Sequence, residues 1–173
     1  GSSDLFYFNK NGVLKRNKSE FKNYYNNIAT DDQKILLNGL KKCIKISKKA
    51  TIIVQENNNK FELYGRDDTY ECDPEIVLEK GSGATSNDEF PGLGHIIYIN
   101  DRGDNNTGFL SSGTDSYGNS KKVQAPVSTA FIHELLDEFY NTIVTGKISE
   151  ESPGIDKVQN QNVALRILGK DER

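Results

Sequence analysis

The chain lacks methionine altogether, and its 173 residues begin with Gly1-Ser2. A sequence without methionine and with a glycine-serine start is typical of a piece cut from a longer protein, so we interpret residues 1–3 as a remnant of cloning. Residues 4–173 are enough to bury a sizeable core, and we expect them to form a single domain.

Apolar residues are also scarce, because they make up only 35% of the chain. This composition predicts long polar loops. The apolar runs fall far short of the ~20 residues that cross a bilayer, so we expect no membrane span. The net charge of −3 provides no general attraction to nucleic acid or to an anionic membrane. We therefore expect no nucleic-acid partner.

Cysteine and histidine, two residue types that commonly bind zinc, occur only twice each. Cys43 and Cys72 do not have the Cys-x-x-Cys spacing of metal or redox motifs, and we interpret them as free thiols, with a disulfide between them as the alternative. The histidines are His95 and His133, and their small number excludes a histidine-rich metal site.

Apolar periodicity predicts helices in three segments: 31–47, 127–145 and 155–168. β-branched residues predict strands at 51–55 and 95–100, and the first of these is expected to form a hairpin with 61–64 across an Asn-rich turn. The polar segments that precede the first and second helices are expected to be largely irregular: 4–30 and 101–122. The predicted fold class is α+β, with a small, mostly antiparallel sheet packed against the helices.

The second predicted helix contains the sequence His133-Glu134-x-x-Asp137, one residue away from the His-Glu-x-x-His helix of zinc metallopeptidases. Residues four apart lie on one face of a helix, so His133 and Asp137 can reach the same ion. Imidazole and carboxylate are both ordinary zinc ligands. Glu134 is placed to take a proton from a metal-bound water. The pattern predicts a metal site in which a carboxylate replaces one histidine, which makes the ion a weaker Lewis acid.

A structural interpretation of the same helix competes with the metal site. An apolar stripe at helical spacing would face the core: Ile132, Leu135, Leu136, Phe139 and Ile143. His133 and Asp137 lie in a second row beside this stripe, where they are also able to bond only to each other.

The segment from residue 96 to 173 resembles the NleD-like zinc metallopeptidase effectors and related peptidase domains of bacterial polymorphic toxins. The resemblance covers a little under half of the chain. It rests on the strand Ile96–Asn100, a polar loop, the Pro/Ser lead into the His-Glu helix, and a C-terminal pattern of four residues: Asn162, Arg166, Gly169 and Arg173. Asp137 stands where the family usually has its second histidine.

The resemblance implies a zincin-like fold with His133 as the first Zn²⁺ ligand and Glu134 as the general base. Asp137 would be the second ligand. The third ligand would come from the acidic start of the last helix, where we select Asp156, with two alternatives: Glu150 and Glu151. Tyr140 lies in the row beside His133, and we name it as a donor to the oxyanion, with two alternatives: Tyr98 and Tyr117.

The predicted function is that of a zinc-dependent endopeptidase, a hydrolase that cleaves a target-cell protein through a metal-activated water. As a bacterial effector or toxin domain, it would be secreted or delivered by a secretion system, and a cognate immunity protein would cover its cleft. The strand Ile96–Asn100 would accept substrate at a sheet edge, or would lie inside the sheet. The alternative function is a catalytically degenerate domain that binds a protein partner, and a third possibility is a purely structural domain.

Overall fold

The computed structural model describes residues 5–56, 60–62, 69–71, 84–90, 94–101, 109–146 and 156–173. Helices and small, mostly antiparallel sheets make up these ranges, so the predicted α+β class is confirmed. The chain divides into two compact units, Gly1–Ser47 and Lys48–Arg173. Compactness does not decide whether each unit folds by itself, so the single domain stays a prediction. No helix in the described ranges is long and apolar enough to cross a bilayer.

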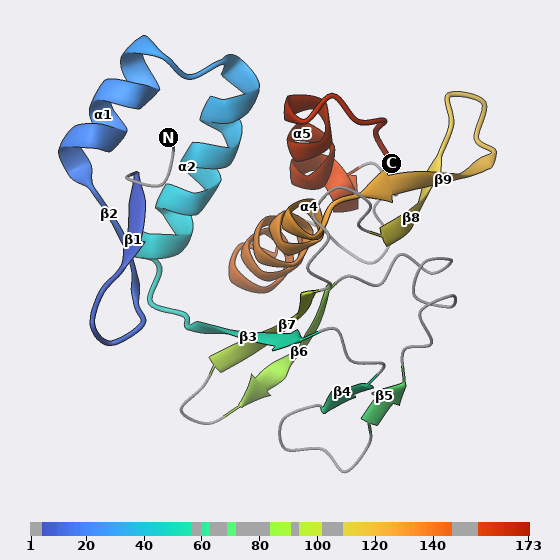
Figure 1. The fold of residues 1–173 in the computed structure, drawn as a ribbon, viewed down its shortest axis with the longest axis horizontal. Coiled ribbons are helices and arrows are strands. Elements are labelled where there is room, and N and C mark those ends of the chain that lie inside the picture. Colours follow the sequence, from blue (N-terminus) through green and yellow to red (C-terminus); the bar gives the residue numbers. More distant parts are fainter. Residues whose placement is uncertain are drawn as a thin grey trace. The chain divides into compact units, whose positions relative to one another are not determined.

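The first unit is a β-hairpin followed by two helices (Figure 1). Its elements are β1 (Phe6–Phe8), β2 (Leu14–Arg16), α1 (Lys18–Asn27) and α2 (Asp31–Lys45). Leu5, Phe21, Ala29 and Leu37 form its buried core. The ring of Phe21 meets Phe6 edge-on at 5.8 Å between centroids and stacks on Tyr25 at 5.7 Å. The contact of Phe6 with Phe21 joins the hairpin to α1, and the stack of Phe21 on Tyr25 lies within α1.

α2 begins at the residue that the sequence predicts, Asp31, because Thr30 and Gln33 form a capping box. The Gln33 N–H donates to Thr30 Oγ1 (3.3 Å), and the Thr30 N–H donates to Gln33 Oε1 (2.9 Å). The expectation of an irregular segment at 4–30 is wrong, because it contains β1, β2 and α1. Only Phe21 of α1 is fully buried, so apolar periodicity is too weak there to reveal a helix.

The second unit contains a three-stranded sheet with the strand order β3-β7-β6 (Figure 1). Its strands are β3 (Ala50–Glu56), β6 (Ala84–Phe90) and β7 (Gly94–Asp101). The central strand β7 pairs with β3 in parallel and with β6 antiparallel. Its residues Ile96, Ile97 and Ile99 are buried, as expected of a strand between two neighbours.

One prediction about strand pairing is wrong, and of the two alternatives for Ile96–Asn100 the strand inside the sheet is confirmed. Residues 51–55 do not form a hairpin with 61–64, because β3 pairs with β7, whereas β4 (Lys60–Glu62) pairs with β5 (Thr69–Glu71). Residues Ile96–Asn100 do not form a sheet edge, because β7 has a hydrogen-bonded strand on each side. This strand therefore has no free edge to which an extended substrate peptide can add.

The helical part of the second unit packs on this sheet. α4 (Val127–Ile132) continues directly into η2, a π-helix at His133–Val144. The 3-10 turn η3 (Asp156–Val158) leads into α5 (Gln159–Ile167). α4 and η2 contact β6 and β7, and α5 contacts both α4 and η2. The predicted helices at 127–145 and 155–168 are confirmed to within two residues at each end.

The π-helical hydrogen bonding of η2 changes which side chains face the interior. In a π-helix the N–H of a residue bonds to the carbonyl five positions earlier, as in the Thr145 N–H to Tyr140 O bond of 3.1 Å. Each turn is wider than in an α-helix, so the predicted α-helical stripe fails at its end. Ile143 is 41% exposed, whereas Glu134 and Asp137 are buried. Two carboxylates of this helix are thus buried.

Part of the predicted loop at 101–122 is a second hairpin, formed by β8 (Phe109–Thr114) and β9 (Ser120–Ala125). Asp115 closes its turn by accepting hydrogen bonds from the N–H groups of Tyr117 (2.9 Å) and Asn119 (2.8 Å). The buried residues Val123 and Ala125 of β9 pack with Leu165 of α5. The hairpin therefore adjoins the helix whose start contributes to the candidate site.

Candidate functional site

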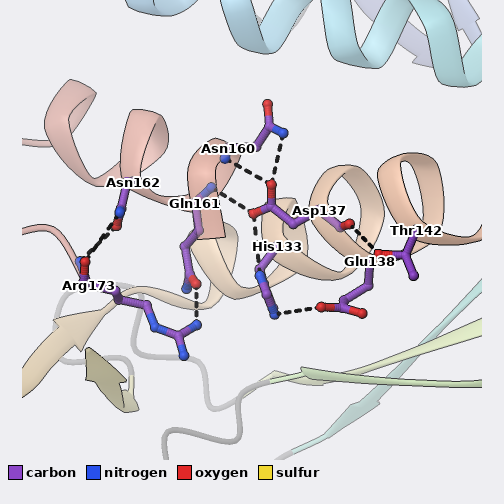
Figure 2. Close-up of polar contacts among 8 residues, drawn as sticks. All are labelled: His133, Asp137, Glu138, Thr142, Asn160, Gln161, Asn162 and Arg173. Carbon is purple, nitrogen blue, oxygen red and sulfur yellow. Dashed lines mark hydrogen bonds and ion pairs between the residues drawn. The ribbon is translucent and has the colours of Figure 1, made fainter. Parts of the chain in front are cut away.

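His133 and Asp137 of the His-Glu-x-x-Asp pattern lie where η2 meets the start of α5 (Figure 2). Glu134 and Asp137 are buried, and His133 is partly buried. The C-terminal segment supplies Arg173 to the same region, and Arg173 carries a positive charge close to the two carboxylates. The site is therefore a polar junction between two helices and the end of the chain.

Asp137 is the centre of this junction, and its carboxylate binds the first turn of α5. Oδ1 accepts hydrogen bonds from the backbone N–H of Asn160 (2.9 Å) and from the side-chain amide of the same residue (2.9 Å). Oδ2 accepts from the backbone N–H of Gln161 (3.1 Å). The first N–H groups of a helix lack partners within it, and Val158 at the N-cap of α5 supplies no side-chain cap. Asp137 therefore caps α5 from a different helix.

The ring of His133 lies between two carboxylates of its own helix. Nδ1 is 3.3 Å from Oδ2 of Asp137, and Nε2 is 3.7 Å from Oε1 of Glu138. The tautomer that carries its proton on Nδ1 donates a hydrogen bond to Asp137. The predicted meeting of His133 and Asp137 on one helix face is confirmed, and so is their bond to each other.

Arg173 is held at the site through its backbone as well as its side chain. Asn162, which is buried, accepts from the Arg173 N–H (2.7 Å) and donates to the Arg173 carbonyl (3.3 Å). Nη1 of Arg173 donates to Oε1 of the buried Gln161 (2.5 Å). Burial lowers the pKa of Arg173, while the neighbouring carboxylates of Asp137 and Glu134 act in the opposite direction. The guanidinium stays charged, because arginine does not lose its proton in proteins.

The C-terminal pattern that suggested the resemblance has a structural role at each position. Gly169 has a φ of +64° and ends α5, with the Gly169 N–H bonded to Arg166 O (3.0 Å) and the Lys170 N–H to Leu165 O (2.9 Å). This is a Schellman motif, which reverses the chain. Arg166 pairs with Glu172 at 3.1 Å. The chain reversal and this ion pair bring the residues after α5 back to Asn162, which bonds to Arg173. The four residues of the C-terminal pattern therefore position Arg173.

The described residues do not fit a zinc centre. A tetrahedral zinc site takes three or four protein ligands, and no group of three or more His, Cys, Asp or Glu residues gathers in the described part of the chain. His133 and Asp137 supply two such ligands. The carboxylate of Glu138 lies at the other ring nitrogen of His133, 3.7 Å from Nε2, and the amide of Gln161 and the guanidinium of Arg173 lie on the side of Asp137. A fixed positive charge beside the two ligands opposes the entry of a second cation.

The other predicted ligands and donors have varied positions. The side chain of Asp156 and residues Glu150 and Glu151 lie outside the described residues, as does the side chain of Tyr98. Tyr140 is half-buried on η2, so its role as an oxyanion donor stays a prediction. Tyr117 is exposed on the turn between β8 and β9.

His95 is buried and stacks on Phe139 at 5.4 Å between centroids. Cys43 is a free thiol, and burial raises its pKa to about 12, whereas Cys72 lies outside the described residues.

Sequence reasoning missed three contributors to the site: Asn160, Gln161 and the side chain of Arg173. Their partner Asp137 lies more than 20 positions earlier, and no local pattern reports a contact at that separation. One signal was present, because α5 starts after Val158 without a Ser, Thr, Asp or Asn at its N-cap. A buried helix start without a cap of its own requires an acceptor from elsewhere in the fold.

Comparisons with protein-family models, with curated proteins and with solved structures found no match. The resemblance to metallopeptidase effectors therefore stays a prediction.

Asp137→Ala is expected to destabilise the protein by about 3 kcal/mol, because it removes a helix cap and leaves buried N–H donors without an acceptor. Glu138→Ala on the same helix is the matched control, since this partly exposed side chain lies 3.7 Å from Nε2 of His133 and does not cap α5, and a change within about 0.5 kcal/mol is expected. Urea unfolding followed by circular dichroism measures both. Equal, small effects in the two variants would show that Asp137 does not cap α5.

Proposed function

We propose that this domain acts by binding a protein partner and that its His-Glu-x-x-Asp helix is a structural junction without hydrolytic activity. The observation that carries the proposal is the use of both Asp137 oxygens by the start of α5. In a hydrolytic zinc site the ligands serve the ion and leave one position for water. Here the carboxylate that would be a ligand is directed at three N–H donors of a neighbouring helix.

The surroundings of Glu134 support the same conclusion. A general base must accept a proton from the attacking water. The positive charge of Arg173 interacts with the buried Glu134, so this carboxylate already has a charge partner within the chain. Glu134 in this setting is a counter-ion more than a proton acceptor. The retained glutamate therefore has a role that does not require catalysis.

A surface of the first unit supports partner binding. Successive side chains of a strand point to opposite faces, and in β1 the ring of Phe6 contacts Phe21 on the inner face. Tyr7 points outward, opposite Lys15, with Val13 diagonal to it on the same face. Tyr7 is 52% exposed and Val13 is 48% exposed. Tyrosine is among the residues enriched at protein interfaces and at their energetic centres, so Tyr7 is the residue of this face that favours partner binding.

One observation favours the endopeptidase as a second candidate function. Two ligands of a tetrahedral zinc ion lie ~3.3–3.5 Å apart when each bond is ~2.0–2.2 Å, and His133 Nδ1 lies 3.3 Å from Asp137 Oδ2. Under this candidate Asp156 remains the proposed third ligand and Glu134 the base. The chain would then be a delivered bacterial effector or toxin domain with a protein substrate and a possible immunity protein.

Zinc content separates the two candidates. After incubation with zinc and removal of the excess, we expect far less than one zinc per wild-type chain, because the described residues bring together only two ligands and a guanidinium lies nearby. We also expect no cleavage of an unstructured protein such as casein. The matched control is His133→Ala, which should give the same zinc content and the same absence of cleavage. One zinc per chain that is lost in His133→Ala, together with cleavage lost in Glu134→Gln, would establish the endopeptidase instead.

The partner-binding half of the proposal predicts that Tyr7→Ser with Val13→Ser abolishes capture of a specific protein from the cell in which the chain acts. The substituted side chains are exposed, so the melting temperature should hardly change. Tyr117→Ser is the matched control, because Tyr117 is also exposed but lies on the β8–β9 turn of the second unit. Quantitative mass spectrometry of the captured proteins compares the three baits. Recovery of one protein set by all three would contradict recognition through the hairpin.

A further inference from the structure

The position of Arg173 is determined by contacts on several sides. Asn162 bonds both its N–H and its carbonyl. On another side, a Cβ atom added at Gly113 of β8 would lie 2.6 Å from the backbone of Arg173, which is too close for any residue but glycine at position 113. The backbone of Arg173 therefore lies tightly between α5 and the β8–β9 hairpin. An ordinary solvent-exposed arginine would not need this arrangement.

The guanidinium of Arg173 acts on the two carboxylates that a cation site would use. It bonds to Gln161, whose backbone N–H bonds to Asp137, and its charge interacts with both Asp137 and Glu134. Buried carboxylates are costly without a compensating positive charge. In metalloproteins such a charge is often supplied by a bound ion, and here an arginine of the chain supplies it.

We propose that Arg173 is the resident cation of this site and that it excludes divalent metal ions from the His133–Asp137 pair. This inference rests on the proposed function, in which the native chain holds no zinc. Arginine and a divalent ion compete for the same negative charge, so neutralising residue 173 leaves the carboxylates with an uncompensated charge. The separation of His133 Nδ1 and Asp137 Oδ2, 3.3 Å, then suits two ligands of one ion.

The test is isothermal titration calorimetry of the full chain with zinc chloride. Arg173→Gln removes the charge but keeps an amide that can donate to Gln161, and Arg173→Lys keeps the charge. We expect Arg173→Gln to bind zinc at least tenfold more tightly than the wild type, and Arg173→Lys to behave as the wild type. Arg173→Gln with His133→Ala should lose the gain, because the new affinity depends on the imidazole.

A second variant displaces Arg173 from the site without changing the charge of its side chain. Gly113→Ala should displace the backbone of Arg173, because its new methyl group overlaps that backbone, and zinc affinity should again rise. Gly118→Ala, at a turn glycine with open space around it, controls for strain in the same hairpin. Its positive φ of +84° lowers stability, but it should not change zinc affinity.

The possible results separate this inference from the proposed function. Folded Arg173→Gln and Gly113→Ala proteins without a gain in zinc affinity would overturn the inference and leave the proposed function intact. A gain that survives His133→Ala would also overturn it, because the ion would then be bound elsewhere. Stoichiometric zinc binding by the wild type that is lost in His133→Ala would overturn the proposed function itself. If Arg173→Gln does not fold, the zinc affinity of Gly113→Ala decides whether the inference holds: a gain supports it, and no gain overturns it.

Discussion

The bonds between the Asp137 carboxylate and the first N–H groups of α5 are the interaction on which this part of the fold depends. They join two helices that are more than 20 residues apart in the chain. They also satisfy a helix start that has no capping side chain of its own. Because the carboxylate is buried and its acceptors are in use, the same interaction limits the chemistry that the site can perform.

The first half of η2 is buried, so Glu134 and Asp137 are enclosed by the fold while Ile143 near the end of the helix is exposed. Two buried carboxylates then need a positive charge, which Arg173 supplies from the end of the chain. The tail pattern and the His-Glu helix thus belong to one network: the helix contributes the negative charges, and the Schellman turn and Asn162 position the cation. A pattern that suggests catalysis in the sequence is explained here by helix capping and charge neutralisation.

Local patterns allowed much of the fold to be predicted. The apolar periodicity of α2 and the β-branched residues of β7 each signal a structure within a few residues, and these elements are confirmed. The parallel pairing of β3 with β7 was missed, because it joins segments about 45 residues apart and an Asn-rich turn nearby suggested a hairpin. At the site, helical spacing brought His133 and Asp137 together correctly. Helical spacing could not reveal that the first turn of α5 would bind the Asp137 carboxylate. It also could not reveal that the charge of Arg173 would lie close to the same carboxylate.

Hydrogen exchange of the Asn160 and Gln161 backbone amides tests the central claim most directly. If Asp137 caps α5, both amides at this helix start should exchange slowly in the native protein, unlike the first N–H groups of an uncapped helix. Their protection should fall in Asp137→Asn by far more than that of Leu165, whose amide lies farther along α5. Fast exchange of both amides in the native protein would contradict the account, because it would leave the Asp137 carboxylate available for a metal ion.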